Sequence, residues 1–386
     1  MCTSPLFRFN TGKYDYLRTD TYGQVRYPLF VGKYSVFQSL FPGSWEDMLI
    51  RGVYQRIPCC QCLECKINLS KQWADRCTLE AMSYPADQCT FITLTIDQDH
   101  LYSEFMSDCV DLETGEIFHV PEVQKRPLQL FLKRIRSAFP DNKLRFFGCG
   151  EYGSRNYRPH YHLLLYGLDF HDLKPLEDIV AGISGDSLYQ SDTLDKLWNK
   201  GIAAVAPFSW ASAAYVARYT TKKLYSKEER EARDRIIVYD GIEFTNSADF
   251  QRYLISGELA RAEYKSQNSF KRYKLAHTRQ FSSPFIEMSR RPGIGSEAYS
   301  TALYEHDAIC IPNGYKSHVS KPFRYFDKRL KQERPDLYNE VHESRARFSL
   351  EQELVEVYSS DEPYDDRLDR KSEQLKRKLS ALRRSL

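Results

Sequence analysis

Apolar residues recur with two different periods along the first 225 residues of the chain. Apolar side chains at helical spacing predict helices over residues 66–83, 126–139 and 210–225. Short β-branched and aromatic runs predict strands over residues 89–96, 144–152, 158–167 and 201–209. Two runs on either side of residues 113–115 predict a hairpin over residues 109–120. Because hairpins accompany the alternating strands and helices, the pattern favours an α+β fold over a doubly wound one, with a mixed or antiparallel sheet and helices on one side.

The pattern also predicts four segments. Residues 1–57 are rich in Tyr, Phe, Gly and Pro without a clear period, which indicates an irregular N-terminal arm with short strands. Residues 58–225 hold the sheet and a cysteine cluster, and residues 226–330 form a basic and aromatic accessory region. Residues 331–386 are predicted to be a helical tail, with leucines at heptad spacing from Leu368.

Composition narrows the class of protein. The chain has 386 residues, of which 42% are hydrophobic and 28% charged, as in globular proteins. An aromatic share of 14% suits base stacking, although core packing uses aromatics equally well, and a net charge of +3 neither requires nor excludes nucleic acid. No run approaches the roughly 20 apolar residues of a membrane span, and the first ten residues lack the apolar core of a signal peptide. Ten cysteines then indicate reduced thiols in a cytoplasm.

A histidine pair is the first candidate for chemistry. His160 and His162 lie two residues apart on a predicted strand, so both imidazoles project from one face. Glu151 ends the preceding strand, and the short turn between the strands would fold it back toward the pair as a third metal ligand. Such a set leaves positions open for water or phosphate oxygens. The alternative is that the pair is simply the polar face of an amphipathic strand.

Two tyrosines are the second candidate. At ~100° per residue, Tyr215, Tyr219 and Lys222 share one face of a predicted helix. A phenol with a pKa near ~10 is a weak nucleophile unless its oxyanion is stabilised, by a nearby lysine or by a metal acting through the phosphate. Attack on a phosphodiester would leave a phosphotyrosine and a free 3′-hydroxyl, so the strand could be resealed. The alternative is an aromatic stripe packed into the core.

Taken in order, these motifs resemble the HUH endonuclease superfamily. Residues 91–96 are similar to its first strand motif, residues 159–162 (PHYH) to its paired-histidine motif, and residues 215–222 to its two-tyrosine helix. The chain is most similar to the replication initiator proteins of microviruses, the gokushovirus-like single-stranded DNA phages. The runs LQLFLKR, CGEYG and MSRRPGIG contribute to that likeness, which covers roughly residues 57–330.

The resemblance implies an HUH-type central antiparallel sheet flanked by helices, and a nickase and strand-transferase that starts rolling-circle replication. Glu151, His160 and His162 would bind Mg²⁺ or Mn²⁺, Tyr215 or Tyr219 would attack the scissile phosphate, and Lys222 would offset negative charge. The expected partners are single-stranded DNA with a replication origin and the host replication helicase and polymerase, in the host bacterial cytoplasm and away from membranes. A relaxase or transposase of the same superfamily, or a non-catalytic zinc-cysteine DNA-binding protein, are the alternatives.

Basic side chains near these motifs are candidates for phosphate contacts, although solvated surface charge is an equally good interpretation of them. The predicted DNA-binding residues are Arg155, Arg158, Lys223, Arg290 and Arg291. Pro292 and Gly293 follow the last two, and a rigid turn there would fix both guanidinium groups.

The cysteine cluster departs from the family pattern, which has glycine where this chain has Cys60. The spacing of Cys59, Cys62 and Cys65 suits a zinc site with Cys77 as a fourth ligand, but buried thiols explain it equally well, and both interpretations stay open.

Overall fold

The structure is a computed structural model of the full chain. It describes residues 2–14, 27–110, 117–153, 158–176, 187–219, 237–239, 242–244, 284–298, 309–314, 316–321 and 323–384. The chain forms two compact units: one comprises residues 1–69, 304–308 and 321–386, and the other comprises residues 70–303 and 309–320. Among the described residues, no helix is both long and apolar enough to cross a membrane.

The first unit contains a small antiparallel sheet in the order β2-β1-β3. Its strands are β1 (Leu6–Phe9), β2 (Phe30–Val31) and β3 (Tyr54–Ile57). Its helices are α1 (Thr11–Tyr14), α2 (Tyr34–Leu40), α3 (Trp45–Ile50), α14 (Arg324–Glu333), α15 (Pro335–Tyr358) and α16 (Tyr364–Arg384). Helix α4 (Leu63–Ala81) begins in this unit and continues into the second. The predicted short strands of the arm and the helical tail are both present.

The N-terminal arm is packed against the C-terminal tail within this first unit. Aromatic residues of the arm share one core with Tyr364 and Leu368 of α16. Asp365 accepts hydrogen bonds from the backbone N–H groups of Tyr34 (3.0 Å) and Ser35 (2.8 Å). These contacts join segments more than 300 residues apart in sequence, which spacing along the chain does not reveal. The bounds of the four predicted segments rest on composition and stay a prediction.

The second unit is built on a seven-stranded sheet in the order β14-β7-β8-β4-β11-β10-β9, in which every neighbouring pair is antiparallel. The four strands predicted from the sequence are consecutive at its centre: β7 (Arg145–Tyr152), β8 (Pro159–Tyr166), β4 (Cys89–Leu94) and β11 (Ala203–Pro207). The strands nearer the edges, which the sequence did not predict, are β14 (Phe285–Met288), β10 (Tyr189–Ser191) and β9 (Leu173–Pro175).

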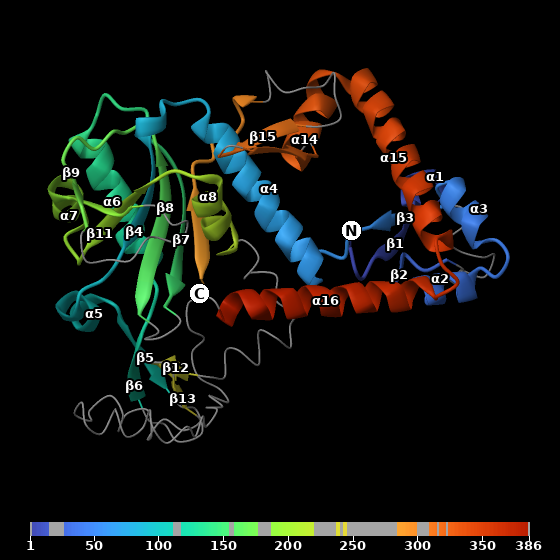
Figure 1. Ribbon diagram of the computed structural model, residues 1–386, viewed down its shortest axis with the longest axis horizontal. Coiled ribbons are helices and arrows are strands. Elements are labelled where there is room, and N and C mark those ends of the chain that lie inside the picture. The colour runs from blue at the N-terminus through green and yellow to red at the C-terminus, as the bar shows by residue number, and fades with distance from the viewer. Residues whose placement is uncertain are drawn as a thin grey trace. The chain divides into compact units, whose positions relative to one another are not determined.

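Helices cover both faces of this sheet (Figure 1). Helices α6 (Lys125–Ala138) and α7 (Asp192–Trp198) pack against one face, and α4 and α8 (Trp210–Ala217) pack against the other. In β8 the odd-numbered side chains from Tyr161 face α6 and α7, and the even-numbered side chains from His162 face α4 and α8. The prediction of helices on one side was therefore wrong. The reason is that β7 and β8 are buried at nearly every position, as strands covered on both faces are.

Shorter elements complete the second unit. They are the 3₁₀ turn η2 (Ala86–Gln88), the helix α5 (Gln98–Glu104), and the strand pairs β5 (Met106–Val110) with β6 (Ile117–Pro121), β12 (Ile237–Tyr239) with β13 (Ile242–Phe244), and β15 (Ile309–Asn313) with β16 (Lys316–Ser320). The pair β5 and β6 is the hairpin expected near residues 109–120.

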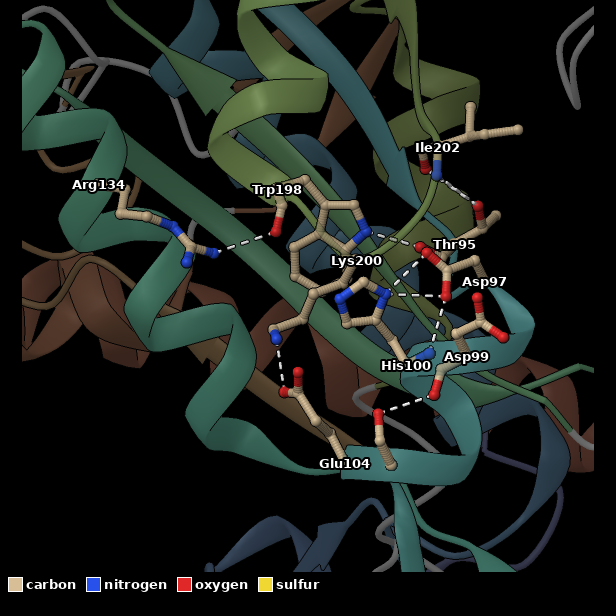
Figure 2. Close-up of polar contacts among 10 residues, drawn as sticks. Thr95, Asp97, Asp99, His100, Glu104, Arg134, Trp198, Lys200 and Ile202 are labelled. Atoms are coloured by element: carbon tan, nitrogen blue, oxygen red, sulfur yellow. Dashed lines mark hydrogen bonds and ion pairs between the residues drawn. The ribbon is translucent and has the colours of Figure 1, made fainter.

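The chain leaving β4 is tied to the turn before β11 (Figure 2). Trp198 Nε1 donates to the carbonyl oxygen of Thr95 at 2.6 Å, and the Thr95 N–H donates to the carbonyl oxygen of Ile202 at 2.9 Å. Gly201 has φ 141°, and a Cβ there would come within 2.5 Å of the Thr95 oxygen. Close approach and positive φ both require glycine at this point. The end of β4 is thus held in place two residues beyond Thr93, which contacts the candidate site.

A buried ion pair anchors the turn at residues 289–296. Arg145 Nε donates to Glu80, and both side chains are almost fully buried, with 6% and 4% exposed. The same Glu80 accepts the Gly295 N–H at 2.6 Å, while Arg145 donates to the Pro292 carbonyl oxygen at 2.8 Å. Each charge is therefore neutralised, and the turn that carries Arg290 is fixed to α4 and β7.

Substituting Glu80→Gln is expected to lower the free energy of unfolding by about 3 kcal/mol, because Arg145 would stay buried without a counter-charge. Urea unfolding followed by tryptophan fluorescence measures this change. Asp192→Asn removes an ion pair whose side chains are 64% and 58% exposed, and it is expected to leave the midpoint nearly unchanged. Equal shifts for the two variants would contradict the assignment of Glu80 as the anchor.

Candidate active site

Strand pairing brings the three predicted metal ligands together. The register between β7 and β8 sets Glu151 directly opposite His160 and sets Cys149 opposite His162. Since side chains two apart share a face, Glu151, His160 and His162 all project from the sheet surface that α8 covers. The pairing of β7 with β8 therefore sets Glu151 beside the histidine pair.

The ligand atoms of the three residues lie within contact distance of one another. Glu151 Oε1 is 3.1 Å from His160 Nε2 and 3.0 Å from His162 Nε2. Glu151 and His162 are buried, whereas the His160 side chain is 19% exposed. The three candidate atoms all lie within 4.8 Å of one another. One carboxylate and two imidazoles facing one point are a donor set that divalent cations such as Mn²⁺ accept.

The second nitrogen of each imidazole fixes its orientation. His160 Nδ1 lies 3.1 Å from the carbonyl oxygen of Arg158, which can only accept, so Nδ1 carries a proton. His162 Nδ1 lies 3.0 Å from Thr93 Oγ1. A proton on His160 Nε2 lets this nitrogen donate to the Glu151 carboxylate; with a metal ion bound, Nε2 would lose that proton and turn its lone pair to the ion. Outer hydrogen bonds such as those at Nδ1 are typical of metal-ligating histidines.

The charge on Glu151 is maintained by the same contacts. Burial alone would raise the pKa of this carboxyl group, but hydrogen bonds from His160 and His162 hold its pKa well below the usual range. The carboxylate is thus ionised throughout the neutral pH range. An ionised carboxylate is the form that binds a metal ion.

Both predicted nucleophiles are beside this group. The Tyr215 hydroxyl donates to Glu151 Oε1 at 3.1 Å and lies 3.3 Å from His162 Nε2. The Tyr219 hydroxyl donates to the Tyr215 hydroxyl at 3.3 Å. Tyr215 is partly exposed, whereas Tyr219 is only 6% exposed and follows the end of α8 at Ala217. Glu151 is also a hydrogen-bond partner of Tyr219, so both phenols border the ligand group.

Burial raises the pKa of both tyrosines, and the negative charge of Glu151 raises it further. Neither phenol is thus ionised at neutral pH by the protein's own groups at this site. The Arg218 guanidinium lies over the Tyr215 ring at 4.9 Å from its centroid and adds a positive charge to the exposed side. An additional positive charge near the hydroxyls would be needed to make either of them a good nucleophile.

Helix α8 is held against the sheet at its first turn. Ser209 and Ser212 form a reciprocal capping box at its start. Trp210 Nε1 donates to Asp75 Oδ1 at 2.8 Å, and His318 Nε2 lies 2.8 Å from the same oxygen. Asp75 is fully buried in α4. These contacts fix the start of the helix, and with it the position of Tyr215 one and a half turns later.

The basic residues predicted to bind DNA lie in several separate segments, only some of which the structure describes. Arg158 is partly exposed at the start of β8, and its guanidinium donates to Gln98. Arg290 and Arg291 are exposed in the anchored turn after β14. Arg155, Lys222 and Lys223 lie outside the described residues. Contact of any of these residues with DNA stays a prediction.

Thr93, Phe91 and Asp75 contact the candidate site but were given no role in the sequence analysis, although residues 91–96 were noted there as a strand motif. The Phe91 ring is stacked on that of His162, with centroids 5.5 Å apart and planes 11° apart. Thr93 faces His162 across the β4–β8 pairing. Alternation in residues 89–94 sets Phe91 and Thr93 on one face, so the signal for these two was present. Asp75 has no such signal, because its partners lie 135 and 243 residues away.

The chain is similar to known replication-associated proteins over the segment that carries this site. Residues 89–224, which contain the whole ligand group and both tyrosines, match the family of the replication-associated protein ORF2. Among individual proteins, the chain is similar to replication-associated protein ORF2 of Spiroplasma virus 4, with 32% identity over 182 residues. It is also similar to replication-associated protein VP4 of Bdellovibrio phage phiMH2K (30% over 174 residues) and ORF4 of Chlamydia phage 1 (31% over 168 residues).

These matches confirm the predicted resemblance to replication proteins of small single-stranded DNA phages. They cover 46%, 43% and 43% of this chain, and the chain spans about half the length or less of these relatives, with 51%, 48% and 38% covered. No solved structure matches the chain.

Proposed function

We propose that this protein initiates rolling-circle replication by nicking single-stranded DNA at an origin and rejoining it through a tyrosine-linked intermediate. The observation that supports this most directly is the contact of the Tyr215 hydroxyl with both Glu151 and His162. A core position for an aromatic stripe would not require a phenol to touch a group suited to metal binding. The similarity to phage replication-associated proteins favours an initiator over a relaxase or transposase.

Glu151, His160 and His162 would hold Mg²⁺ or Mn²⁺, which supplies Lewis-acid polarisation of the scissile phosphate. The chain's own groups then orient the reaction. Thr93 and the Arg158 carbonyl oxygen hold the imidazoles, so that Nε2 of each faces the same point. The partly exposed His160 and Tyr215 form the side on which a sugar-phosphate link can approach.

Tyr215 is the first nucleophile in this proposal, because its hydroxyl contacts both Glu151 and His162 and its side chain is more exposed than that of Tyr219. A bond forms between the phenolic oxygen and phosphorus, and the bond from phosphorus to the 3′-oxygen breaks. The phenol loses its proton and the departing 3′-oxygen gains one, so the energy of the ester is retained for rejoining. Tyr219 performs the second cut, when the regenerated origin is cleaved and the first circle is closed.

The DNA partner would approach from the side of Arg158, Arg290 and Arg291, each of which is at least partly exposed. A guanidinium held by a turn contacts phosphate without reading sequence. Lys222, Lys223 and Arg155 are proposed to add to this surface, with Lys222 offsetting charge on the transferring phosphate. Host helicase and polymerase as partners, and the host cytoplasm as the site of action, follow from the same role.

The proposal is tested by labelling a pool of random-sequence single strands at either the 3′ or the 5′ end. The full chain is incubated with each pool and Mn²⁺, and the denatured protein is separated on a gel. In the proposed reaction the tyrosine is joined to the 5′ phosphate of the downstream fragment, which carries the original 3′ end. Only the 3′ label is therefore expected on the protein. Peptide mass spectrometry then identifies the tyrosine that carries a nucleotide.

EDTA is expected to abolish the labelled protein band. A protein that binds the strands but stays unlabelled with both pools would contradict the proposal and favour the non-catalytic DNA-binding alternative. Transfer of the 5′ label would contradict the proposed polarity.

A further inference from the structure

Four cysteines of the first unit lie close together in space, although one of them is 57 residues from the nearest of the other three in sequence. Cys2 precedes β1, Cys59 and Cys62 lie in the turn after β3, and Cys65 is in the first turn of α4. The antiparallel register of β1 with β3 pairs Leu6 with Ile57. Continued beyond both strands, that register brings Cys2 level with the turn that holds Cys59 and Cys62.

The distances between the sulfur atoms fit metal coordination better than a disulfide. Cys2 Sγ is 3.5 Å from Cys59 Sγ and 3.7 Å from Cys62 Sγ, and all four sulfurs lie within 4.8 Å of one another. A disulfide would bring two sulfurs to about 2.05 Å. Four thiolates at about 2.3 Å from one zinc ion stand about 3.8 Å apart, as the corners of a tetrahedron. The four thiols are free, and the observed separations lie close to that value.

Backbone N–H groups point at these sulfurs. Cys59 Sγ accepts from the N–H groups of Gln61 (3.5 Å) and Cys62 (3.2 Å), and Cys62 Sγ accepts from that of Cys65 (3.5 Å). Cys2 Sγ accepts from the N–H of Cys59 at 3.4 Å. Such contacts stabilise the thiolate form that a metal requires. In this turn these backbone N–H groups donate to sulfur atoms and not to carbonyl oxygens, so the backbone is oriented toward the thiol groups.

The turn itself adopts an unfavourable backbone conformation to make these contacts. Cys60 has φ 60°, in the left-handed region that non-glycine residues rarely occupy. Its own side chain is exposed and points out of the group. Residues in such conformations persist where the surrounding structure holds them there, and here the neighbouring Cys59 and Cys62 are held by Cys2.

We propose that Cys2, Cys59, Cys62 and Cys65 bind one Zn²⁺ ion in a closed structural site. Thiolates are soft ligands that select zinc over Mg²⁺ or Mn²⁺, so this site differs in chemistry from the group at Glu151. Four protein ligands leave no open position, which assigns the ion a structural role. The ion ties the residues before β1 to the start of α4, across the small sheet of the first unit.

Cys77, the fourth ligand considered from the sequence, is not part of the group. It is fully buried against Tyr166 and Phe147 on the α8 side of the large sheet. Twelve residues of helix separate it from Cys65, which is about 18 Å along the axis of α4. No zinc ion could bind both thiols.

The test measures metal content of the full chain, purified under reducing conditions, by mass spectrometry of the elements. One zinc per chain is expected, with loss of that zinc in Cys59→Ser and in Cys2→Ser. Cys60→Ser is the matched control, because it removes a cysteine in the same turn whose sulfur is exposed, and it is expected to keep the zinc. Retention of zinc in Cys59→Ser, or its absence from the unsubstituted chain, would overturn the proposal.

A second measurement does not depend on how well the cysteine variants fold. Exchange of the bound metal for Co²⁺ in the unsubstituted chain is expected to give the intense visible bands of tetrahedral cobalt with thiolate ligands. The double variant His160→Ala, His162→Ala is expected to show the same bands, which separates this site from the candidate active site. Cobalt bands without thiolate charge-transfer absorption, or iron in place of zinc, would contradict the assignment.

Discussion

Tyr215→Phe is expected to lower the rate of covalent attachment to single-stranded DNA by about 10³-fold or more, because it removes the proposed nucleophile and leaves the ring in place. The Tyr215 hydroxyl contacts both Glu151 and His162, and this side chain is more exposed than that of Tyr219, so it is the phenol placed for the first attack. The rate is measured from transfer of a 3′-labelled strand to the protein in the presence of Mn²⁺.

Tyr219→Phe provides the internal comparison. It is expected to leave the first attachment nearly intact but to prevent a protein that already carries one strand from cutting a second, labelled strand. Tyr102→Phe, at an exposed position on α5, is the matched control and is expected to change neither reaction. If Tyr215→Phe and Tyr219→Phe together still form the adduct, the assignment of both nucleophiles is incorrect.

His162→Ala is expected to lower the same rate by about 10³-fold and to weaken Mn²⁺ binding, because it removes one of only two imidazoles in the group. Thr93→Val keeps the imidazole but removes the hydroxyl 3.0 Å from Nδ1. This substitution is expected to weaken Mn²⁺ binding by about 10- to 100-fold, the usual effect of losing an outer hydrogen bond to a metal ligand. Titration of Mn²⁺ against the rate separates the two effects.

His171→Ala removes an exposed histidine that pairs with Asp169 at 2.9 Å, away from the candidate site. Unchanged Mn²⁺ dependence is expected for this control. Mn²⁺ binding is expected to weaken most in the His162 variant, less in the Thr93 variant and not at all in the His171 variant. This order would show that the effect comes from the ligand group and not from removal of any histidine. Equal loss in the Thr93 and His162 variants would contradict the assigned difference in their roles.

The candidate site was predictable from the sequence because its residues are close together in two short segments. A spacing of two on a strand is sufficient to set His160 and His162 on one face, and the pairing of β7 with β8 sets Glu151 opposite His160. The spacing of four predicts that Tyr215 and Tyr219 share a face, and the structure joins their hydroxyls by a hydrogen bond although α8 ends at Ala217. What the sequence did not supply is the packing of that helix on the same face of the sheet, which depends on Asp75 in α4 and His318 in β16.

Long-range pairing explains what the sequence did not predict. Residues 285–288 have no alternation or β-branched run of their own, and they form β14 because they pair with β7 at Phe285 and Gly150. Cys2 was overlooked as a partner of the cysteine cluster for the same reason, since 57 residues separate it from Cys59. The central strands, by contrast, are apolar enough to be recognised without knowledge of their partners.

The hydrogen bond between the two phenols has a consequence for timing. Tyr219 donates to the oxygen of Tyr215, so that oxygen helps to hold the second phenol in its buried position. In the proposed reaction, esterification of Tyr215 by DNA would make this oxygen a much weaker acceptor and remove that restraint, leaving Tyr219 hydrogen-bonded to Glu151. Formation of the first linkage would then loosen the second tyrosine and favour a fixed order for the two proposed cuts.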